Sequence, residues 1–431
     1  MPGDLPLPRF EFPPEQPSLW TMLRRGVSYV ASVIPEAILT EPGVQLPFTG
    51  APLVVVDPAL VREILNDRDG RFVRDRYSRR LFRRAWGKGL AGAEGEDWQR
   101  QRRAAAPAFR PQAVADNVAA FAAAAATAAR AWPTGEPIEL THRVARIIAD
   151  IVFTALVDGR GAVDTAAVAA DMPGYISRIA SFGLRDVLPL PEAWHDWLSG
   201  VPDDPAVQRL RALAQRLAAE RHSDGTSEDL IALLDGAGPI EDNIRGLFPA
   251  AMDTTAAGTS WTLYTLALRP EWQARVAAEA RGCGGELTLD SLPLTRRVVQ
   301  EVLRLYPPGP MLIRSAAADG ELGGFRLRKG QPVMPHIYAM HRHRTLWDDP
   351  DGFDPDRFLP ERGTHPGWLP FGVGPRVCIA AQFALAEIAV VVARLLAELE
   401  LTPTGPEPEV SLQVTTRSHT GLHVIARKRA D

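Results

Sequence analysis

The sequence has little cysteine, no long apolar run and little net charge, and each shortage excludes a class of protein. Only 2 of the 431 residues are cysteine, which excludes a disulfide framework and a cysteine-rich zinc site. No apolar run reaches the roughly 18 residues of a membrane helix, so we expect no membrane span. The 48 basic and 52 acidic residues give a net charge of −4, so nucleic acid is not expected as the main partner.

The N-terminus also lacks the basic region and apolar core of a signal peptide, and a reducing, cytoplasmic setting fits these absences. Hydrophobic residues make up 46% of the chain and charged residues 23%, which excludes a disordered protein. Proline, by contrast, is abundant, with 38 residues. So many helix breakers predict many separate helices rather than a few long ones.

One large, mostly helical domain with small β-sheets is the fold class that the pattern predicts. We expect the proline-rich residues 1–20 to form a tail or irregular strap and residues 21–431 to form a single domain. Apolar and alanine-rich patterns predict helices over residues 58–66 and over most of residues 98–306. A long apolar helix is predicted for residues 378–399.

Alternating patterns predict strands in three places. Residues 44–57 read as a hairpin around Thr49-Gly50, and residues 322–337 read as another around Arg328-Lys329-Gly330. Residues 411–428 end the chain in strand-like alternation.

Two motif-like patterns carry little weight. Gly87-x-Gly89-x-x-Gly92 has the spacing of a dinucleotide-binding loop, but it lacks the strand and helix that the loop requires on either side. His341-x-His343 has no third ligand nearby in the sequence, so we interpret it as a solvated polar turn.

The strongest signal is Phe371-Gly-Val-Gly-Pro-Arg-Val-Cys-Ile-Ala380, where one cysteine follows a glycine-rich loop and opens an apolar helix. Free N–H groups at a helix N-terminus stabilise a thiolate. Gly374 permits close backbone approach to a flat ligand, and Arg376 offers a fixed cation to an acidic group. Taken alone, Cys378 would favour a buried structural role.

Taken as a whole, this segment resembles the haem-binding signature F-x-x-G-x-R-x-C-x-G of the cytochrome P450 family. Phe371, Gly374, Arg376 and Cys378 match it, and Ala380 replaces the last glycine. The resemblance implies the mainly α, triangular haem-thiolate fold of that family. It also implies a haem b cofactor with Cys378 as the axial ligand of the iron.

Further matches follow in the family's order, from about residue 40 to residue 428. Glu301-x-x-Arg304 resembles the E-x-x-R motif, which places a carboxylate and a guanidinium on one helical face. Arg357 matches the arginine that joins this pair in the family.

Two other segments match the cation sites for the haem propionates. Trp98-x-x-x-Arg102 resembles the family's propionate-binding helix. Arg314 lies where the family has another cation for a propionate. The resemblance therefore implies that Arg102, Arg314 and Arg376 bind the propionates through charge-assisted hydrogen bonds.

Residues 240–268 resemble the family's oxygen-binding helix, with Ala250-Ala-Met-Asp253-Thr254 in place of [AG]-G-x-[DE]-T. The resemblance implies that Asp253 and Thr254 deliver protons to dioxygen, as general acids do. Ala251 replaces the glycine of this motif.

Pro249, directly before the motif, is a second departure from the pattern. It has no N–H, so the carbonyl of Arg245 loses its helical hydrogen bond. We expect the helix to open by one turn here, and the Thr254 hydroxyl to turn back to the Ala250 carbonyl.

The resemblance implies a monooxygenase that inserts one oxygen atom from O2 into a small hydrophobic substrate. Ala250 and the segment Met311, Leu312 and Ile313 fall where the family lines its substrate pocket, and apolar side chains suit such a ligand. Because no flavin or ferredoxin domain follows residue 431, we expect electrons from a separate ferredoxin and an NAD(P)H-dependent ferredoxin reductase. Two alternatives stay open: a peroxide-driven haem-thiolate enzyme, and a non-catalytic haem protein that binds or senses a small molecule.

The arginines of residues 71–84 admit two interpretations. A run of like charge usually forms a solvated surface. The sharper hypothesis is that one of these arginines meets an anionic group on the substrate.

Overall fold

The computed structural model describes residues 5–17, 30–47, 51–157, 163–180, 205–224, 230–284 and 287–429. The predicted turn at Thr49-Gly50 lies outside the described residues, as do the helix breaks predicted near Pro189 and Pro202.

Helices make up most of the described chain, as the sequence predicted. They are α2 (Pro58–Leu65), α3 (Arg76–Trp86), α4 (Gly95–Ala105), α5 (Pro111–Arg130), α6 (Leu140–Val157), α7 (Thr165–Ala180), α10 (Pro205–Asp224), α11 (Leu230–Leu234), α12 (Ile240–Ala267), α13 (Pro270–Gly282), α14 (Pro293–Leu305), α15 (Ile337–Met340) and α16 (Ala381–Glu398). Short 3₁₀ turns lie at Val30–Val33, Glu36–Leu39, Ala106–Phe109, Pro355–Phe358 and Pro360–Arg362.

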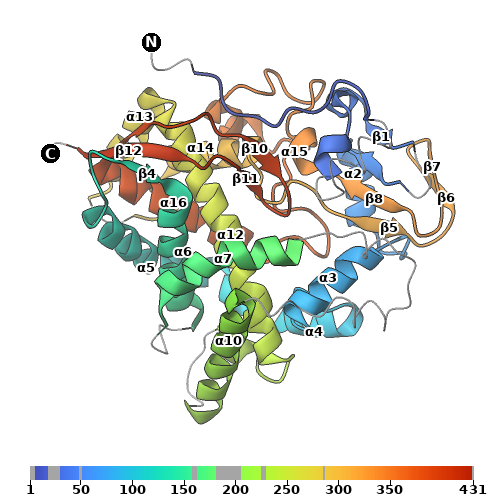
Figure 1. Cartoon of the computed structure of the whole chain (residues 1–431), viewed down its shortest axis with the longest axis horizontal. Coiled ribbons are helices and arrows are strands. Elements are labelled where there is room, and N and C mark those ends of the chain that lie inside the picture. The colour runs from blue at the N-terminus through green and yellow to red at the C-terminus, as the bar shows by residue number, and fades with distance from the viewer. Residues whose placement is uncertain are drawn as a thin grey trace.

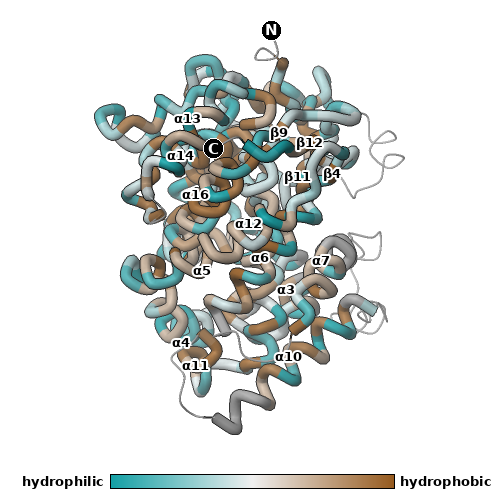
Figure 2. Tube along the Cα trace, turned by 90° about the vertical axis from the view of Figure 1, so that its left-hand side faces the viewer, coloured by the Kyte–Doolittle hydropathy of each residue, from teal (hydrophilic) through white to brown (hydrophobic). Residues whose placement is uncertain are grey.

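The core of the helical part forms around α12 and α16. Helix α12 runs through the middle of the molecule and packs against α6, α16, α14 and α10 (Figure 1). Helix α16 also packs against α5 and α13, and almost every residue from Phe383 to Leu396 is buried. Figure 2 shows this concentration of apolar residues along α16. Burial of most of its surface explains why the sequence of α16 is mostly apolar.

The strands are mostly short and form four small sheets beside the helices. The largest has the order β1 (Gly43–Gln45), β2 (Leu53–Val55), β8 (Pro332–Pro335), β5 (Arg314–Ala316) and β3 (Phe72–Val73). The others are β4 (Pro137–Glu139) with β12 (His423–Lys428) and β9 (Leu399–Pro403), then β6 (Gly320–Leu322) with β7 (Phe325–Leu327), and β10 (Val410–Leu412) with β11 (Thr416–Ser418). Strand β4 interrupts a segment that the alanine-rich pattern had predicted as helix.

The turn of the second predicted hairpin was placed at the wrong residues. The antiparallel pair is β6 with β7, and the chain reverses at Gly323-Gly324 rather than at Arg328-Lys329-Gly330. Both glycines have positive φ, at 53° and 86°, which suits a tight hairpin turn. Strand β8, which the alternation assigned to the same hairpin, instead pairs in parallel with β2 and antiparallel with β5.

The described N-terminal residues form an irregular strap that packs on the helical core. Phe12 is buried, the Tyr306 hydroxyl donates to the Pro8 carbonyl at 2.7 Å, and the Phe10 N–H donates to the Tyr338 hydroxyl at 2.9 Å. These contacts fix residues 5–17 to the domain.

A buried charged network joins α14 to the loop that leads toward the cysteine segment. Arg304 and Glu301 are both fully buried, and two guanidinium nitrogens of Arg304 donate to the two carboxylate oxygens of Glu301 at 2.8 Å. Arg304 also donates to the carbonyls of His341, Pro350 and Gly352.

The third member of this network is Arg357, whose Nε lies 3.4 Å from the Glu301 carboxylate. The backbone N–H of Asp354 donates to the same carboxylate at 2.9 Å. The structure thus brings together the three residues that the resemblance singled out for this core.

His341 lies inside this network, so the interpretation of a solvated polar turn is wrong. Both His341 and His343 are buried. The Nδ1 of His341 lies 3.1 Å from the Arg304 carbonyl, and its Nε2 accepts the Leu369 N–H at 3.0 Å. Burial, and then the positive charge of Arg304, lowers the pKa of His341 to about 3. The ring is therefore a neutral link between α14 and the cysteine segment.

We expect this histidine to weaken the fold in acid. The unfolded chain takes up its proton near pH 6.5, whereas the pKa of folded His341 is lowered to about 3. The stabilising effect is therefore complete above pH 6.5 and is lost as the pH falls toward 3. The free energy of unfolding should fall by up to about 1.4 kcal/mol per pH unit for this one proton. Urea titrations across this range measure the slope.

Two variants separate this effect from general acid denaturation. His341→Gln should have a shallower slope than the parent, while His142→Gln, at a side chain that is 77% exposed, should keep the parental slope. Equal slopes in the parent and in His341→Gln would contradict the assignment.

Candidate active site

The segment before α16 forms a compact loop stabilised by its own backbone. The Cys378 N–H donates to the Phe371 carbonyl at 3.0 Å, and the Val377 N–H donates to the Gly374 carbonyl at 3.0 Å. Helix α16 begins at Ala381, three residues later than predicted. Cys378 therefore lies in the turn that leads into the helix and not in its first turn.

Gly374 is required by the backbone, for two reasons. Its φ is 84°, in the left-handed region that side chains rarely adopt. A Cβ at this position would lie 2.2 Å from the carbonyl oxygen of Leu65, at the end of α2. The close backbone approach made by this glycine is thus to α2, an approach that the sequence alone did not indicate.

The thiol of Cys378 is unpaired and lies on an exposed residue, yet protein atoms surround it closely enough to raise its pKa. The residue is thus accessible from one side, while the protein packs around the rest of the thiol. Burial raises the pKa, while the N–H of Ala380 and the positive charge of Arg102 lower it. A bound metal cation deprotonates such a thiol, because its positive charge stabilises the thiolate that burial disfavours.

Cys283 has a different environment. It is half-buried, and its Sγ lies 3.3 Å from the carbonyl oxygens of Glu279 and Ser291. Its thiol is engaged with the backbone. Of the two cysteines, Cys378 alone has the environment of a ligand.

Arginines from four segments gather beside the cysteine loop. The guanidinium of Arg376 lies 4.4 Å from the ring centre of Trp98, and that of Arg102 lies 5.7 Å from the same ring. Arg376 also donates to the Ala93 carbonyl at 3.0 Å. Burial, followed by the positive charges of Arg74 and Arg314, lowers the pKa of Arg376 to about 10.

This arginine cluster, defined as Arg74, Arg102, Arg314 and Arg376, is chemically suited to an anion. Burial lowers the pKa of each member, so each is less well solvated than a surface arginine. Glu94 offsets part of this charge, from 3.7 Å away from Arg74. An added anion with two carboxylates would relieve the remaining repulsion.

The role of Arg74 in this cluster was not predicted from the sequence, where it was grouped with the arginines of residues 71–84. Its side chain is only 12% exposed, and it donates to the carbonyls of Ala91 and Gly92 at 3.2 Å. Arg80 is buried as well, whereas the arginines at positions 71, 76, 79 and 83 are exposed. The exposed four fit a solvated surface, whereas Arg74 and Arg80 are not part of one. The side chain of Arg84 lies outside the described residues.

Helix α12 presents a short open face. Thr254 is exposed and Ala250 and Ala251 are half-exposed, although the rest of the helix is buried along most of its length. The Thr254 hydroxyl donates to the Ala250 carbonyl at 2.8 Å, which confirms the predicted hydrogen bond. The helix, however, runs unbroken through Pro249. The predicted opening of the helix by one turn is therefore not observed.

Asp253 points away from Thr254. Its carboxylate accepts hydrogen bonds from the Thr415 hydroxyl and from the guanidinium of Arg417, both in or next to β11. Neither Thr415 nor Arg417 could be selected from the sequence, because they lie in an ordinary strand-like pattern far along the chain from α12.

One of the predicted pocket residues, Leu312, lies close to the cysteine loop. Met311, Leu312 and Ile313 are half-exposed, directly before β5. The Leu312 N–H donates to the Pro335 carbonyl at 2.9 Å, which fixes this segment to β8. The Cδ1 of Leu312 lies 3.8 Å from the position that a Cβ on Gly372 would take.

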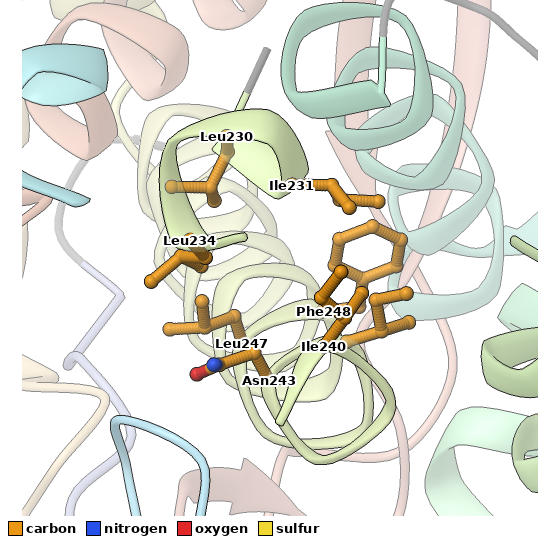
Figure 3. Close-up of a pocket in the computed structure, with 8 residues that line it drawn as sticks. Leu230, Ile231, Leu234, Ile240, Asn243, Leu247 and Phe248 are labelled. Carbon is orange, nitrogen blue, oxygen red and sulfur yellow. The ribbon is translucent and has the colours of Figure 1, made fainter. Parts of the chain in front are cut away.

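A small apolar pocket lies elsewhere, between α11 and the first half of α12 (Figure 3). It is lined by Leu230, Ile231, Leu234, Ile240, Asn243, Ile244, Leu247 and Phe248. None of the predicted site residues lines it, so it is not the site built around Cys378.

Comparison with known proteins agrees with this geometry. The family model described as Cytochrome P450 matches residues 44–423. The chain belongs to the cytochrome P450 family. It is a P450 monooxygenase with a haem cofactor, and its mainly α architecture with small sheets is the fold of that family.

Two bacterial relatives and one plant relative show the breadth of the similarity. Cyclooctat-9-en-7-ol 5-monooxygenase of Streptomyces melanosporofaciens is 30% identical over 418 residues, with 90% of this P450 and 86% of the relative covered. Cyclooctatin synthase of the same organism is 30% identical over 358 residues, with 76% of each chain covered. Protein LUTEIN DEFICIENT 5, chloroplastic, of Arabidopsis thaliana is 26% identical over 421 residues, with 88% of this P450 and 70% of the relative covered.

Within the described residues of this P450, no helix is both long enough and apolar enough to cross a membrane.

Proposed function

We propose that this P450 inserts one oxygen atom from O2 into a hydrophobic organic substrate, with electrons supplied by a separate ferredoxin and its NAD(P)H-dependent reductase. One observation carries the proposal: the unpaired thiol of Cys378 lies beside the arginine cluster. Among the contacts described, this cluster has fewer acidic partners than arginines. When bound, the haem supplies a thiolate-ligated iron at which O2 is activated.

The proposed cofactor is haem b, held without a covalent link. A c-type haem needs a C-x-x-C-H motif, and the two cysteines of this chain are far apart, at positions 283 and 378. Cys378 would ligate the iron, and Arg102, Arg314 and Arg376 would hold the propionates. Arg74 joins them as a fourth cation because its charge acts on both Arg314 and Arg376.

Trp98, Phe371 and Gly374 serve this site by positioning its charged groups. The ring of Trp98 lies against two guanidinium groups, those of Arg102 and Arg376. The carbonyl of Phe371 fixes the backbone at Cys378, and Gly374 lets the loop approach α2.

Asp253 and Thr254 form the proposed proton-delivery pair. The side chain of Arg417 is 29% exposed and contacts Asp253. Through Arg417, the pair of Asp253 and Thr254 connects the open face of α12 with the protein surface. Delivery of a proton to Thr254 requires Asp253 to exchange its contacts with Thr415 and Arg417 for a contact on the side of Thr254.

Thr254→Ala should keep the haem and the thiolate spectrum but divert electrons to hydrogen peroxide, because the hydroxyl that passes protons is gone. General acid catalysis contributes about a hundred- to ten-thousand-fold, so the product formed per electron pair should fall severely. The consumption of NADPH and the formation of peroxide and of product are measured in the same reaction.

Thr262→Ala is the matched control, since the Thr262 hydroxyl makes the same kind of bond, to the Gly258 carbonyl at 2.7 Å, at a fully buried position two turns later. This variant should couple electrons to product like the parent. Equal coupling in Thr254→Ala and Thr262→Ala would exclude Thr254 as the proton donor.

A hydrophobic substrate is supported by the apolar segment Met311–Ile313 and by the small side chain of Ala250 on the open face of α12. One bacterial relative is named as a monooxygenase of cyclooctat-9-en-7-ol, an unsaturated alcohol by its name. A reducing, cytoplasmic setting suits a chain in which both cysteines are unpaired. A screen for ligands that displace iron-bound water, followed by the Soret band, would identify the substrate class.

A further inference from the structure

The glycine-rich loop after α3 packs directly on the first turns of α12. The Lys88 N–H donates to the Asp242 carboxylate at 2.8 Å, and the Leu90 N–H donates to the Asn243 side chain at 2.7 Å. A Cβ on Gly89 would lie 2.6 Å from the backbone oxygen of Asp242. The glycine spacing that resembles a dinucleotide-binding loop therefore serves the close approach of a loop to a helix.

The last turn of α3 contacts α12 one turn further along. A Cβ on Gly246 would lie 3.1 Å from the Cβ of Trp86, so the missing side chain lets the tryptophan approach the helix. The guanidinium of Arg245 donates to the Ala85 carbonyl at 2.9 Å. Helix α3 is thus fixed to α12 immediately before Pro249.

Tyr175 of α7 reaches into the same junction. Its hydroxyl lies 3.2 Å from the Ala85 carbonyl and 3.4 Å from the Arg245 carbonyl. The side chain is buried, and burial raises the pKa of Tyr175 to about 12, so the hydroxyl keeps its proton at neutral pH. One shared proton therefore links α7 to both α3 and α12.

The Arg245 carbonyl is the acceptor that residue 249 would use in a regular helix. Pro249 has no N–H and cannot donate to it. The helix nevertheless runs unbroken through this position. The hydroxyl of Tyr175, 3.4 Å from this carbonyl, offers it a donor in place of the missing N–H.

We propose that Tyr175 is a positioning residue that replaces the helical hydrogen bond removed by Pro249 and so couples α7 to the open face of α12. The residue after Pro249 is Ala250, whose carbonyl accepts the Thr254 hydroxyl. A movement of α7 is therefore passed on to the turn that holds Thr254. The effect on turnover rests on the proposed function, whereas the coupling of the two helices does not.

Hydrogen–deuterium exchange in a double-mutant cycle tests the coupling on the haem-loaded protein. Tyr175→Phe should raise the exchange of α7 backbone amides about three- to ten-fold, the loss expected for one neutral hydrogen bond. In Pro249→Ala the new N–H restores the helical bond to Arg245. Tyr175→Phe should then raise α7 exchange by less in that background, because only the contact with the Ala85 carbonyl is left to lose.

Tyr264→Phe is the matched control, because Tyr264 is a buried tyrosine of α12 that packs edge-on against Trp261, away from α7. It should leave α7 exchange unchanged. The same fold-increase from Tyr175→Phe in both backgrounds would overturn the proposed replacement, since the two positions would then act independently.

A second readout tests the consequence for oxygen activation. Tyr175→Phe should form about two- to five-fold less product per electron pair, a part of the effect of one lost hydrogen bond, with the Soret band of the ferrous carbonyl complex unchanged. Parental coupling in this variant would overturn the link to Thr254. The exchange experiment needs no turnover, so its result stands even if the monooxygenase proposal fails.

Discussion

Replacing Cys378 with alanine is expected to abolish the red-shifted Soret band of the ferrous carbonyl complex and all monooxygenase activity. The band depends on a thiolate bound to the iron, and alanine offers no ligand. Haem retained by the arginine cluster alone would show the spectrum of a complex without thiolate. Absorption spectra of the dithionite-reduced, carbonylated protein measure this directly.

Cys283→Ala is the control, because its thiol is engaged with the carbonyls of Glu279 and Ser291. It should keep the parental spectrum and activity. A red-shifted band that survives Cys378→Ala and is lost in Cys283→Ala would reverse the assignment of the ligand.

Arg304→Ala should strongly destabilise the fold. Removal of the Arg304 side chain leaves the carboxylate of Glu301 fully buried, with only one of its two arginine partners. Breaking a buried pair in this way costs about 3–5 kcal/mol of the free energy of unfolding. The carbonyls of His341, Pro350 and Gly352 also lose their donor. Denaturant titration, with haem content measured in parallel, records both losses.

Arg394→Ala is the matched control, since Arg394 pairs with Glu398 at 2.8 Å on the partly exposed side of α16. A pair of this kind contributes at most about 0.5 kcal/mol. A loss of similar size in the two arginine variants would show that the buried network does not hold the loop before Cys378 in place.

The features that the sequence predicted well are those whose chemistry lies within a few residues of the chain. The need for a glycine at position 374 is one, because the bend of the loop depends on its left-handed φ, although α16 begins three residues later than predicted. The bond from Thr254 to Ala250 is another, since it joins residues one helical turn apart. Such features follow from spacing and backbone conformation alone.

Features that depend on contacts between distant segments were missed. The carboxylate of Asp253 meets Arg417, which lies 164 positions later in the sequence. Arg74 differs from its exposed neighbours only in what the loop before α4 and Arg314 place around it. Strand β8 pairs with β2 from the other half of the chain, so alternation alone assigned it to the wrong partner. No local pattern carries this information.

The unbroken course of α12 through Pro249 belongs to the same group. From the sequence, the missing N–H predicted an open turn. The structure instead brings Tyr175 to the Arg245 carbonyl from a separate helix. The two departures from the family motif thus leave the bond from Thr254 to Ala250 intact.

The central claim is that the chain uses haem-thiolate chemistry to transfer one atom of O2. Its most direct test is turnover in isotopically labelled O2 with a surrogate ferredoxin, its reductase and NADPH. The account predicts that each product molecule carries one labelled oxygen atom and that product formation stops without the ferredoxin. Product that carries no label, or that forms only when hydrogen peroxide replaces the redox proteins, would contradict it.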